Sequence, residues 1–573
     1  MVGKLWLWVS LLFLSLSYCN FSFGQEEGAK TGYRFPMDID PSVSGSYGEL
    51  RPGHFHAGVD FGVRGAVGTR LYAAERGYIS RISVSPSGYG NVIYITHPDG
   101  LTTIYAHMLR FAPRITDYVR EEQYRKESFV VNLYPDSTAF HVERGDFIGE
   151  VGNSGSSMAP HLHFEIRDME REVPLNPLSL LNVEIQDNMP PIFDEVAFFS
   201  ISAQKSFPVR NRIVGYKNET NTITIVSDTF YVAVAATDRQ NRSRGKLAVF
   251  YYRYFLDGEQ IFSFAPDAIP SRSGRDINSV LEYSEFIKPG GKSMIKSWVE
   301  PGCGLSNNIK SINNGLFILR DDETHEVRIE LSDEHGNMAD RKFLVKRDIS
   351  QKGGTTASDS TASDGISIGR NIAMLWFTGN RIVEPDFRYY LEPGFLYSSV
   401  IMNLRRDSVN GQSGWRLHNN NTPLHAPAKI SLKADIPDSL KSKALIATVS
   451  DSGRLSSLGG EWEGDWLTTK SLSFGLYTVA LDTIAPNITT SIKEGERIGN
   501  RIVFTIRDDL SGIADYKVYI DDKWVLAEYD AKSSRLTVSL EGRVIEKGKN
   551  HQVSVEVADR RGNINRINSW FIW

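Results

Sequence analysis

The chain has 573 residues, more than one hydrophobic core usually supports, so several domains are expected. Hydrophobic residues make up 41% of the sequence and charged residues 23%, a balance typical of folded globular proteins that excludes a largely disordered chain. The formal net charge of -5 argues against a protein that binds nucleic acid by neutralising phosphates, so no nucleic-acid partner is expected.

The first residues have the pattern of an export signal. Lys4 precedes an apolar run, Leu5–Leu16, that is too short to cross a membrane as a helix, and small residues follow it. Residues 1–24 are therefore expected to be a signal peptide, and the mature chain is expected in the periplasm or the cell envelope. The alternative is a lipoprotein anchored through Cys19, because the four residues ending there resemble a lipobox, although Tyr18 is bulky for that motif.

Residues 25–183 carry the motifs with chemical content. His56, Asp60 and His163 offer two imidazoles and a carboxylate, which are accepted donors in a catalytic zinc site with three protein ligands. Alternate residues of a β-strand share a face, so a strand would present His161 and His163 side by side and turn the residues between and after them toward the core. The apolar alternation that begins before Asp60 likewise favours a strand over a helix.

These motifs resemble those of the LytM/lysostaphin-type zinc metallopeptidases, which hydrolyse the peptide part of bacterial peptidoglycan. The resemblance covers residues 45–183 and includes further elements in the family's order, namely Gly68–Ala73, Gly88–Asn91, Tyr105–His107, Gly145–Gly149, Gly152–Gly155 and Pro160–Ile166. It implies an antiparallel β-sheet domain that acts on peptidoglycan peptides. It also implies that Zn²⁺ is bound by His56, Asp60 and His163, while the catalytic residues His107 and His161 stay unligated and face the reacting water and the substrate.

One departure from this family is an insertion at residues 112–141. Within it, residues 116–126 are strongly charged and predict a surface helix with Thr116 or Asp117 as its N-cap. This helix either walls the substrate groove or forms a solvated surface excursion, and the sequence leaves both interpretations open.

Residues 184–350 are expected to form one or two Ig-like β-sandwich units. Two β-rich runs within them, Phe230–Ala235 and Val327–Leu331, are separated by frequent turn residues. The segment Asp333–Asn337, which offers good turn chemistry between two last strands, recurs near the C-terminus. The paired segments are Asp187–Pro191 with Asp482–Pro486, and Asp333–Asn337 with Asp559–Asn563.

The remainder divides into a linker and two further β-rich domains. Residues 351–365 are rich in Ser, Thr, Gly and Asp and are expected to be a flexible linker. Residues 366–481 predict a β-rich domain, and residues 482–573 a C-terminal Ig-like domain. The large tryptophans of the former either pack in its core or stack on sugar rings, and they are Trp415, Trp462 and Trp466.

Acidic residues of the last domain raise the question of calcium. Asp508 and Asp509 precede a Leu-Ser-Gly turn, and Asp521 and Asp522 follow nearby. Because the twelve-position calcium loop with its terminal Glu is missing, a structural role in turns is the favoured interpretation.

Together these patterns predict a mainly β protein that works as an exported zinc endopeptidase on peptidoglycan stem peptides or cross-links in cell-wall remodelling. Its β domains are expected to position it at the wall or at a protein partner in the envelope. The alternatives are a non-catalytic scaffold or activator of another wall hydrolase, and an enzyme held latent by its own insertion or β domains. The bond cleaved, either a D-alanyl to diaminopimelyl cross-bridge or an oligoglycine bridge, and the oligomeric state are left open.

Overall fold

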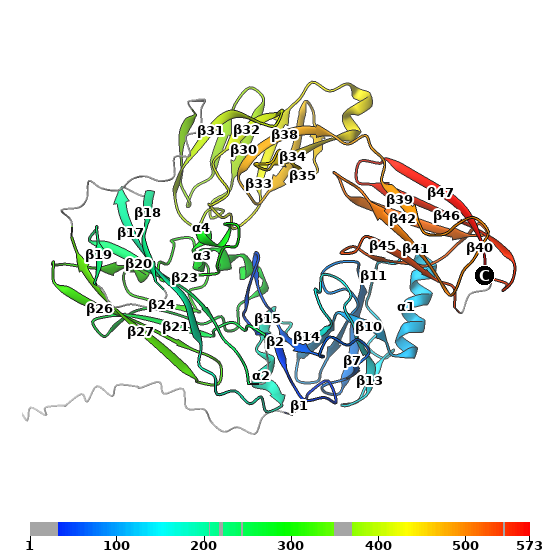
Figure 1. Cartoon of the computed structure of the whole chain (residues 1–573), viewed down its shortest axis with the longest axis horizontal. Coiled ribbons are helices and arrows are strands. Elements are labelled where there is room, and N and C mark those ends of the chain that lie inside the picture. Colours follow the sequence, from blue (N-terminus) through cyan, green and yellow to red (C-terminus); the bar gives the residue numbers. More distant parts are fainter. Residues whose placement is uncertain (1–31, 205–206, 217–221, 242–244, 349–368, 542–544) are drawn as a thin grey trace, which may run out of the picture.

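The computed structural model describes residues 32–204, 207–216, 222–241, 245–348, 369–541 and 545–573. Strands dominate these residues, as the sequence predicts, and they surround four main hydrophobic cores. The cores belong to an N-terminal domain followed by three β-sandwiches, which Figure 1 shows arranged in a ring. The predicted signal peptide, Cys19 and the predicted linker lie outside the described residues, and the predicted domain boundaries remain predictions.

The N-terminal domain is built on a nine-stranded antiparallel sheet. Its strands are β2 (Val43–Gly45), β5 (Val59–Gly62), β7 (Gly77–Val84), β8 (Val92–Thr96), β9 (Leu101–Ala106), β11 (Val131–Leu133), β12 (His141–Val142), β14 (His161–Asp168) and β15 (Val173–Leu175). The order is β11-β7-β8-β9-β14-β5-β2, with β12 beside β7 and β15 beside β14. Strand β14 therefore lies inside the sheet, hydrogen-bonded to β9 on one side and β5 on the other.

Smaller elements complete this domain. A three-stranded sheet has the order β10-β13-β6, and two pairs join β1 with β16 and β3 with β4. The bounds are β1 (Tyr33–Arg34), β3 (Leu50–Arg51), β4 (His54–Phe55), β6 (Arg70–Tyr72), β10 (Met108–Phe111), β13 (Phe147–Val151), β16 (Leu181–Asn182) and the short helix α2 (Pro177–Leu180). The core beneath the large sheet also takes in Ile185, Leu247 and Phe250, so the first sandwich helps to bury the apolar residues of the N-terminal domain.

The insertion folds as a helix, α1 (Pro113–Lys126), which begins earlier than predicted. Pro113 occupies the first turn, where its fixed φ suits a helix start and its missing N–H costs nothing. The predicted cap is wrong: Ala112 is the N-cap, and the Thr116 hydroxyl donates instead to the Phe111 carbonyl at 2.9 Å. The helix buries only a narrow stripe, so it is a surface helix as expected.

The first sandwich is one unit with two sheets. One sheet contains β17 (Ile192–Gln204), β18 (Phe207–Tyr216), β20 (Thr229–Thr237), β23 (Ile295–Lys296) and β25 (Phe317–Ile318). The other contains β19 (Ile223–Ile225), β21 (Tyr251–Leu256), β22 (Glu259–Phe264), β24 (Ile309–Ser311), β26 (Thr324–Ser332) and β27 (Met338–Arg347). Short helical segments lie between strands, namely η1 (Ser271–Asp276), α3 (Ile277–Val280), α4 (Tyr283–Phe286) and η2 (Asn313–Gly315). The two β-rich runs read from the sequence lie in β20 and β26, so both strand predictions are confirmed.

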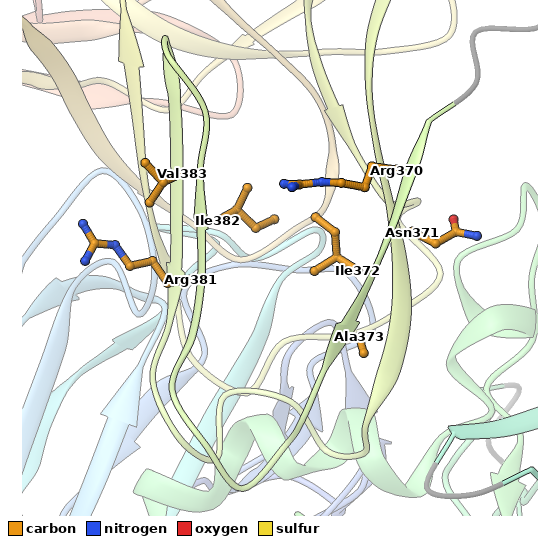
Figure 2. Close-up of a pocket in the computed structure, with 7 residues that line it drawn as sticks. All are labelled: Arg370, Asn371, Ile372, Ala373, Arg381, Ile382 and Val383. Atoms are coloured by element: carbon orange, nitrogen blue, oxygen red, sulfur yellow. The ribbon is translucent and has the colours of Figure 1, made fainter.

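The second sandwich also has two sheets. The first contains β28 (Arg370–Met374), β31 (Val400–Val409), β32 (Gln412–Leu417), β34 (Ala444–Val449), β35 (Leu455–Ser457) and β38 (Gly475–Leu481). The second contains β29 (Asn380–Val383), β30 (Phe387–Leu391), β33 (Ala428–Lys433), β36 (Glu461–Glu463) and β37 (Trp466–Ser471), and a 3₁₀ segment η4 spans Asp438–Lys443. Edge strands β28 and β29 border an open groove in which Ile372 and Ile382 point toward one another (Figure 2). No His, Cys, Asp or Glu lines this groove, so it holds no catalytic set.

Two of the three tryptophans singled out above, Trp415 and Trp462, are packing residues of this sandwich. Trp415 stacks on Phe387, with ring centroids 5.5 Å apart, and Trp462 packs against the same core. Each indole N–H also has a partner, because Trp415 donates to Asp386 and Trp462 to a backbone carbonyl. Trp466 lies beneath the Arg388 guanidinium, 3.7 Å from the ring centroid. The arrangement favours core and surface packing over stacking on sugars.

The third sandwich closes the ring. One of its sheets contains β39 (Asn487–Thr490), β41 (Arg501–Arg507), β44 (Ala527–Asp530) and β45 (Arg535–Ser539). The other contains β40 (Glu496–Arg497), β42 (Ile513–Ile520), β43 (Lys523–Trp524), β46 (Asn550–Asp559) and β47 (Ile564–Ile572). Figure 1 shows this sandwich beside α1 of the N-terminal domain. Tyr124 of α1 meets Trp524 edge to face at 5.1 Å, and the Lys532 ammonium donates to the backbone carbonyls of Asn153 and Ser157. None of the described helices has the length and hydropathy needed to span a bilayer.

Candidate metal centre and active site

Three predicted ligands meet at the junction of β5 and β14. Asp60 on β5 lies directly opposite His163 on β14 in the antiparallel register, and His56 stands just before β5, after β4. The strand prediction is confirmed for Asp60 but not for His56, because the chain turns at Gly58. A Cβ at Gly58 would lie 2.3 Å from the Phe164 carbonyl oxygen, so only glycine fits this close approach to β14.

The three donor atoms converge on one point. His56 Nε2 lies 3.0 Å from Asp60 Oδ1 and 2.9 Å from His163 Nδ1, and His163 Nδ1 lies 2.8 Å from Asp60 Oδ1. All three residues are buried. Two ring nitrogens facing each other beside a carboxylate oxygen form a set of lone pairs that suits a cation, so the residues present can hold a metal ion.

The opposite nitrogen of each ligand imidazole has its own partner. His56 Nδ1 lies 2.6 Å from the Ser46 carbonyl oxygen, and His163 Nε2 lies 2.7 Å from Glu165 Oε1. Because a carbonyl or carboxylate oxygen only accepts, each of these nitrogens carries a hydrogen, and the nitrogen that faces the cluster is the one left to bind a metal. The hydrogen bonds therefore fix both rings in the tautomer that a metal needs. Glu165 is thus the outer contact that orients the His163 ring.

Charges around the cluster keep its carboxylates ionised. Burial raises the pKa of Asp60, but the neighbouring His56 and hydrogen bonds from the imidazoles hold that pKa well below its ordinary value. Arg51 Nη2 donates to Asp60 Oδ2 at 2.7 Å and leaves Oδ1 to face the ligand nitrogens. Burial lowers the pKa of His163, whereas hydrogen bonds to Asp60 and Glu165 raise it to about 9, so a metal ion that binds at Nδ1 would displace a proton from that nitrogen.

A buried network supports His163 from behind. Glu165 is fully buried and accepts hydrogen bonds from Arg167 Nε and the Tyr89 hydroxyl, while Arg167 Nη2 donates to the Tyr89 oxygen at 3.0 Å. The Tyr89 ring also stacks on the His163 imidazole, with centroids 5.2 Å apart. These contacts lock the His163 ring and satisfy the charge of Glu165.

The predicted catalytic pair, His107 and His161, flanks the cluster. Their ring centroids lie 4.9 Å apart, and His161 Nε2 lies 3.4 Å from Asp60 Oδ1 and makes no hydrogen bond. His107 Nδ1 lies 2.9 Å from the Ser154 carbonyl oxygen, and His161 Nδ1 lies 2.8 Å from that of Ala159. Both Nδ1 atoms therefore carry the hydrogen, and both Nε2 atoms offer a lone pair.

His107 is held in an unusual backbone conformation. Its φ of 59° lies in the left-handed region, which costs free energy for a residue with a side chain. The strain is maintained by two hydrogen bonds, from the His107 N–H to the Tyr89 carbonyl and from the Gly152 N–H to the His107 carbonyl. Burial lowers the pKa of His107, with a further contribution from His163 and His161, to about 3. His107 is therefore a neutral, preoriented imidazole.

All five residues border one cleft of about 870 Å³. The rest of its lining comes from three segments, within residues 44–65, 88–89 and 156–160, and no lining residue comes from the insertion at 112–141. The cleft thus favours the interpretation of the insertion as a surface excursion. His54, the neighbouring histidine of the first motif, lines the cleft but stays outside the cluster and is exposed, with Nδ1 near the Pro52 carbonyl.

Several supporting residues could not be assigned from the sequence. Arg167 follows Glu165 by two residues on the same strand face, a signal that strand periodicity supplies. Tyr89 stands in a glycine-rich motif that resembles the family's, although the motif suggests no contact with Glu165. Arg51 carries no sequence signal, because its pairing with Asp60 depends on the hairpin of β3 and β4.

Comparison with protein families agrees with this site. The model of peptidase family M23 matches residues 54–124, which include His56, Asp60 and His107. The model of a Zu5-like domain matches residues 371–482, which correspond to the second sandwich.

Curated relatives match the same part of the chain. The DD-carboxypeptidase/endopeptidase Mpg of Neisseria meningitidis is 30% identical over 161 residues, which are 27% of this chain and 30% of that protein. An uncharacterized metalloprotease of Haemophilus influenzae is 25% identical over 180 residues, 29% of this chain and 32% of that protein. The chain thus spans about a third of the length of these relatives.

Solved structures give a parallel result. The catalytic domain of lysostaphin from Staphylococcus simulans is 28% identical, covering 22% of this chain and 79% of that one, with a TM-score of 0.17. The catalytic domain of the prophage-encoded M23 protein EnpA from Enterococcus faecalis is 26% identical, covering 24% of this chain and 88% of that one, with a TM-score of 0.18. On the family match and the curated relatives, the chain contains a metallopeptidase domain of family M23, of the LytM type.

Proposed function

We propose that the chain is an exported zinc endopeptidase that hydrolyses peptide bonds of peptidoglycan stem peptides or cross-links. The observation that carries this proposal is the convergence of His56, Asp60 and His163, with His107 and His161 beside them, in one open cleft. A non-catalytic scaffold has no need of such a set. The name of the Neisseria relative, a carboxypeptidase and endopeptidase, supports the same class of reaction.

Zinc fits these residues better than a hard cation does. Two nitrogen donors and one carboxylate oxygen are a donor set that zinc prefers, whereas Ca²⁺ and Mg²⁺ prefer oxygen donors throughout. When bound, Zn²⁺ lowers the pKa of a water to about 7 and polarises the scissile carbonyl. Three protein ligands leave room for both roles.

The unligated histidines then have separate tasks. His107 is neutral and offers the lone pair of Nε2, so it accepts the proton of the attacking water. His161 Nε2 lies 3.4 Å from Asp60 Oδ1, and as an imidazolium, with a hydrogen on both ring nitrogens, His161 would donate to the oxyanion that develops on the substrate. Arg51 and Glu165 act through the ligands, by orienting Asp60 and His163.

Digestion of defined muropeptides tests this function. We expect the zinc-loaded full chain to cleave cross-linked muropeptides and a chelator to abolish the cleavage, with activity returning when Zn²⁺ is restored. Mass spectrometry of the products identifies the bond. Muropeptides left intact by a chain that has bound zinc stoichiometrically would contradict the proposal and favour the scaffold.

The contact between the third sandwich and the N-terminal domain leads to a prediction about access. Lys532 binds the carbonyls of Asn153 and Ser157, and Ser157 lies on the cleft rim, where its hydroxyl contacts His161 Nδ1 at 3.2 Å. The sandwich thus stands beside the cleft without lining it. We expect Lys532→Ala to increase release of peptides from intact peptidoglycan, which is bulky, and to leave turnover of small muropeptides unchanged.

The matched control for this prediction is Lys549→Ala, since Lys549 is exposed and pairs only with the neighbouring Glu546 among the described residues. A chain that ends near residue 183 is a poor alternative to Lys532→Ala for testing access, because it would expose apolar residues that Leu247 and Phe250 now cover. Equal rates on intact peptidoglycan for Lys532→Ala and the control would show that the sandwich does not restrict access.

A further inference from the structure

Three aspartates recur at the same places in the first and third sandwiches. In the first sandwich, Asp187 precedes β17, Asp238 directly follows β20 and Asp333 directly follows β26. We name these three residues the Asp187 triad. The equivalent residues of the third sandwich, before β39, after β41 and at the end of β46, are Asp482, Asp508 and Asp559, named the Asp482 triad.

The same hydrogen-bonded frame holds two aspartates of each triad. Asn337 Nδ2 donates to the Asp187 carbonyl at 3.2 Å and to Asp333 Oδ2 at 2.7 Å. In the third sandwich, Asn563 Nδ2 donates to the equivalent carbonyl at 2.8 Å and the equivalent carboxylate at 2.7 Å. The repeated Asp-x-x-Gly-Asn turn therefore brings the segment that opens each sandwich against the segment that closes it.

The frame gathers negative charge without a Lys or Arg to neutralise it, and His335 near Asp187 is the one basic side chain paired with these aspartates among the described residues. Oxygens of Asp482, Asp508 and Asp559 lie within 4.8 Å of one another, and ligand atoms of Asp187, Asp333 and His335 do the same. Within the part of the chain that the structure describes, no Lys or Arg forms an ion pair with any aspartate of either triad. Close, buried carboxylates repel one another and lose hydration, which is costly unless a cation joins them.

Asp238 shows where a cation would lie. It is only 3% exposed, and its Oδ1 has no hydrogen-bond partner in the structure. Asp238 lines a cavity of about 30 Å³, together with Asp187, Asp333, Glu334 and His335. Such a volume suits a single ion or water. Burial, followed by the charges of Asp333 and Asp187, raises the pKa of Asp238 to about 7.

The Asp482 triad has a comparable free donor. Ser511 is 5% exposed, its N–H donates to Asp482 Oδ2 at 3.0 Å, and its hydroxyl oxygen has no partner in the structure. A neutral oxygen is a common complement to carboxylates in calcium sites. A purely structural role of Asp508 in a turn, the interpretation favoured from the sequence, therefore gives no role to the unpartnered Ser511 hydroxyl.

We propose that each triad binds one calcium ion. The donors that the two sites share are carboxylate oxygens, which calcium prefers, and His335 of the first site has no counterpart in the Asp482 triad. Ca²⁺ tolerates irregular carboxylate geometry, whereas Mg²⁺ demands a near-ideal octahedron. Calcium sites in extracellular modules have dissociation constants of about 10⁻⁴ to 10⁻³ M, a range that fits sites open to an exported protein's surroundings.

The positions of the triads give these ions a role in the ring. The cavity at the Asp187 triad is also lined by Val43 and Ser46 of the N-terminal domain. The Asp482 triad lies where β38 of the second sandwich passes into the third, and Arg561 of its turn donates to the Ala444 carbonyl. Each ion would therefore stiffen a junction between domains.

Calorimetric titration of CaCl₂ into the chelator-treated full chain tests the proposal. We expect two calcium ions per chain, one ion for Asp238→Asn and one for Asp508→Asn. The matched controls are Asp340→Asn and Asp515→Asn, which change exposed aspartates of the same sandwiches and should keep both ions. Calcium should also raise the thermal unfolding midpoint of the unaltered chain, a measurement that needs no variant to fold.

Three results would overturn the proposal. The first is no binding heat and no change in the unfolding midpoint at about 10 mM CaCl₂, ten times the weakest dissociation constant expected for such sites. The second is two ions in both triad variants when circular dichroism shows that they are folded. The third is binding at the triads of Zn²⁺ but not of Ca²⁺.

Discussion

His163→Ala is expected to remove both the metal and the peptidase activity while leaving the fold intact. The substitution leaves His56 and Asp60, two donors where a catalytic zinc site uses three. Glu165, buried behind His163, keeps its hydrogen bonds from Arg167 and Tyr89, so no unpaired buried charge is created. Zinc measured by elemental analysis and muropeptide cleavage should both fall to background, and circular dichroism should match the unaltered chain.

His54→Ala is the matched control for this variant. His54 lies in the same motif, borders the same cleft and has a ring nitrogen near a backbone carbonyl, yet it stays outside the ligand cluster. We expect it to retain one zinc ion and to cleave muropeptides at a rate close to that of the unaltered chain. Loss of zinc in His54→Ala together with its retention in His163→Ala would mean that the ligand set is wrong.

The ligand cluster was predictable because it depends on local rules. The two-residue period of a strand places His161 and His163 on one face, and β14 has that geometry. The same rule fails at His56, where Gly58 allows a turn and the ligand reaches the cluster from the end of a hairpin. Sequence spacing carries no information about a turn whose shape depends on contact with a distant strand.

Contacts between segments that lie far apart in the chain could not be predicted from the sequence. Arg51 pairs with Asp60 only because the β3–β4 hairpin brings it there, and Lys532 reaches Ser157 only because two intervening domains bring the third sandwich back to the first domain. The recurrence of Asp-x-x-Gly-Asn was visible as a turn signal, yet its role in gathering carboxylates depends on Asp238 and Asp508, which lie outside the repeated motif. The repeated motifs therefore predicted the sandwiches, but they did not reveal the two aspartate triads that we propose as calcium sites.

His107→Ala is expected to keep the metal and to lower kcat by about 10² to 10⁴-fold, the range for loss of a general base. The hydrogen bond from Nδ1 to the Ser154 carbonyl and the strained backbone hold the ring so that Nε2 faces the cleft. Neither feature involves the atoms that would bind the metal. Because the pKa of His107 is lowered to about 3, the base is unprotonated from about pH 5 to about pH 8. The ratio of kcat between the unaltered chain and the variant should therefore be constant over that range.

The variant His161→Ala distinguishes the roles of the two unligated histidines. If His107 is the base and His161 the donor to the oxyanion, added imidazole should restore part of the turnover of His107→Ala by entering the space left in the cleft. His161→Ala should gain nothing from imidazole, because a freely diffusing base does not replace a donor fixed beside Asp60. Rescue of His161→Ala alone, or a kcat ratio for His107→Ala that rises as the pH passes about 6.5, the ordinary pKa of histidine, would reverse the two roles.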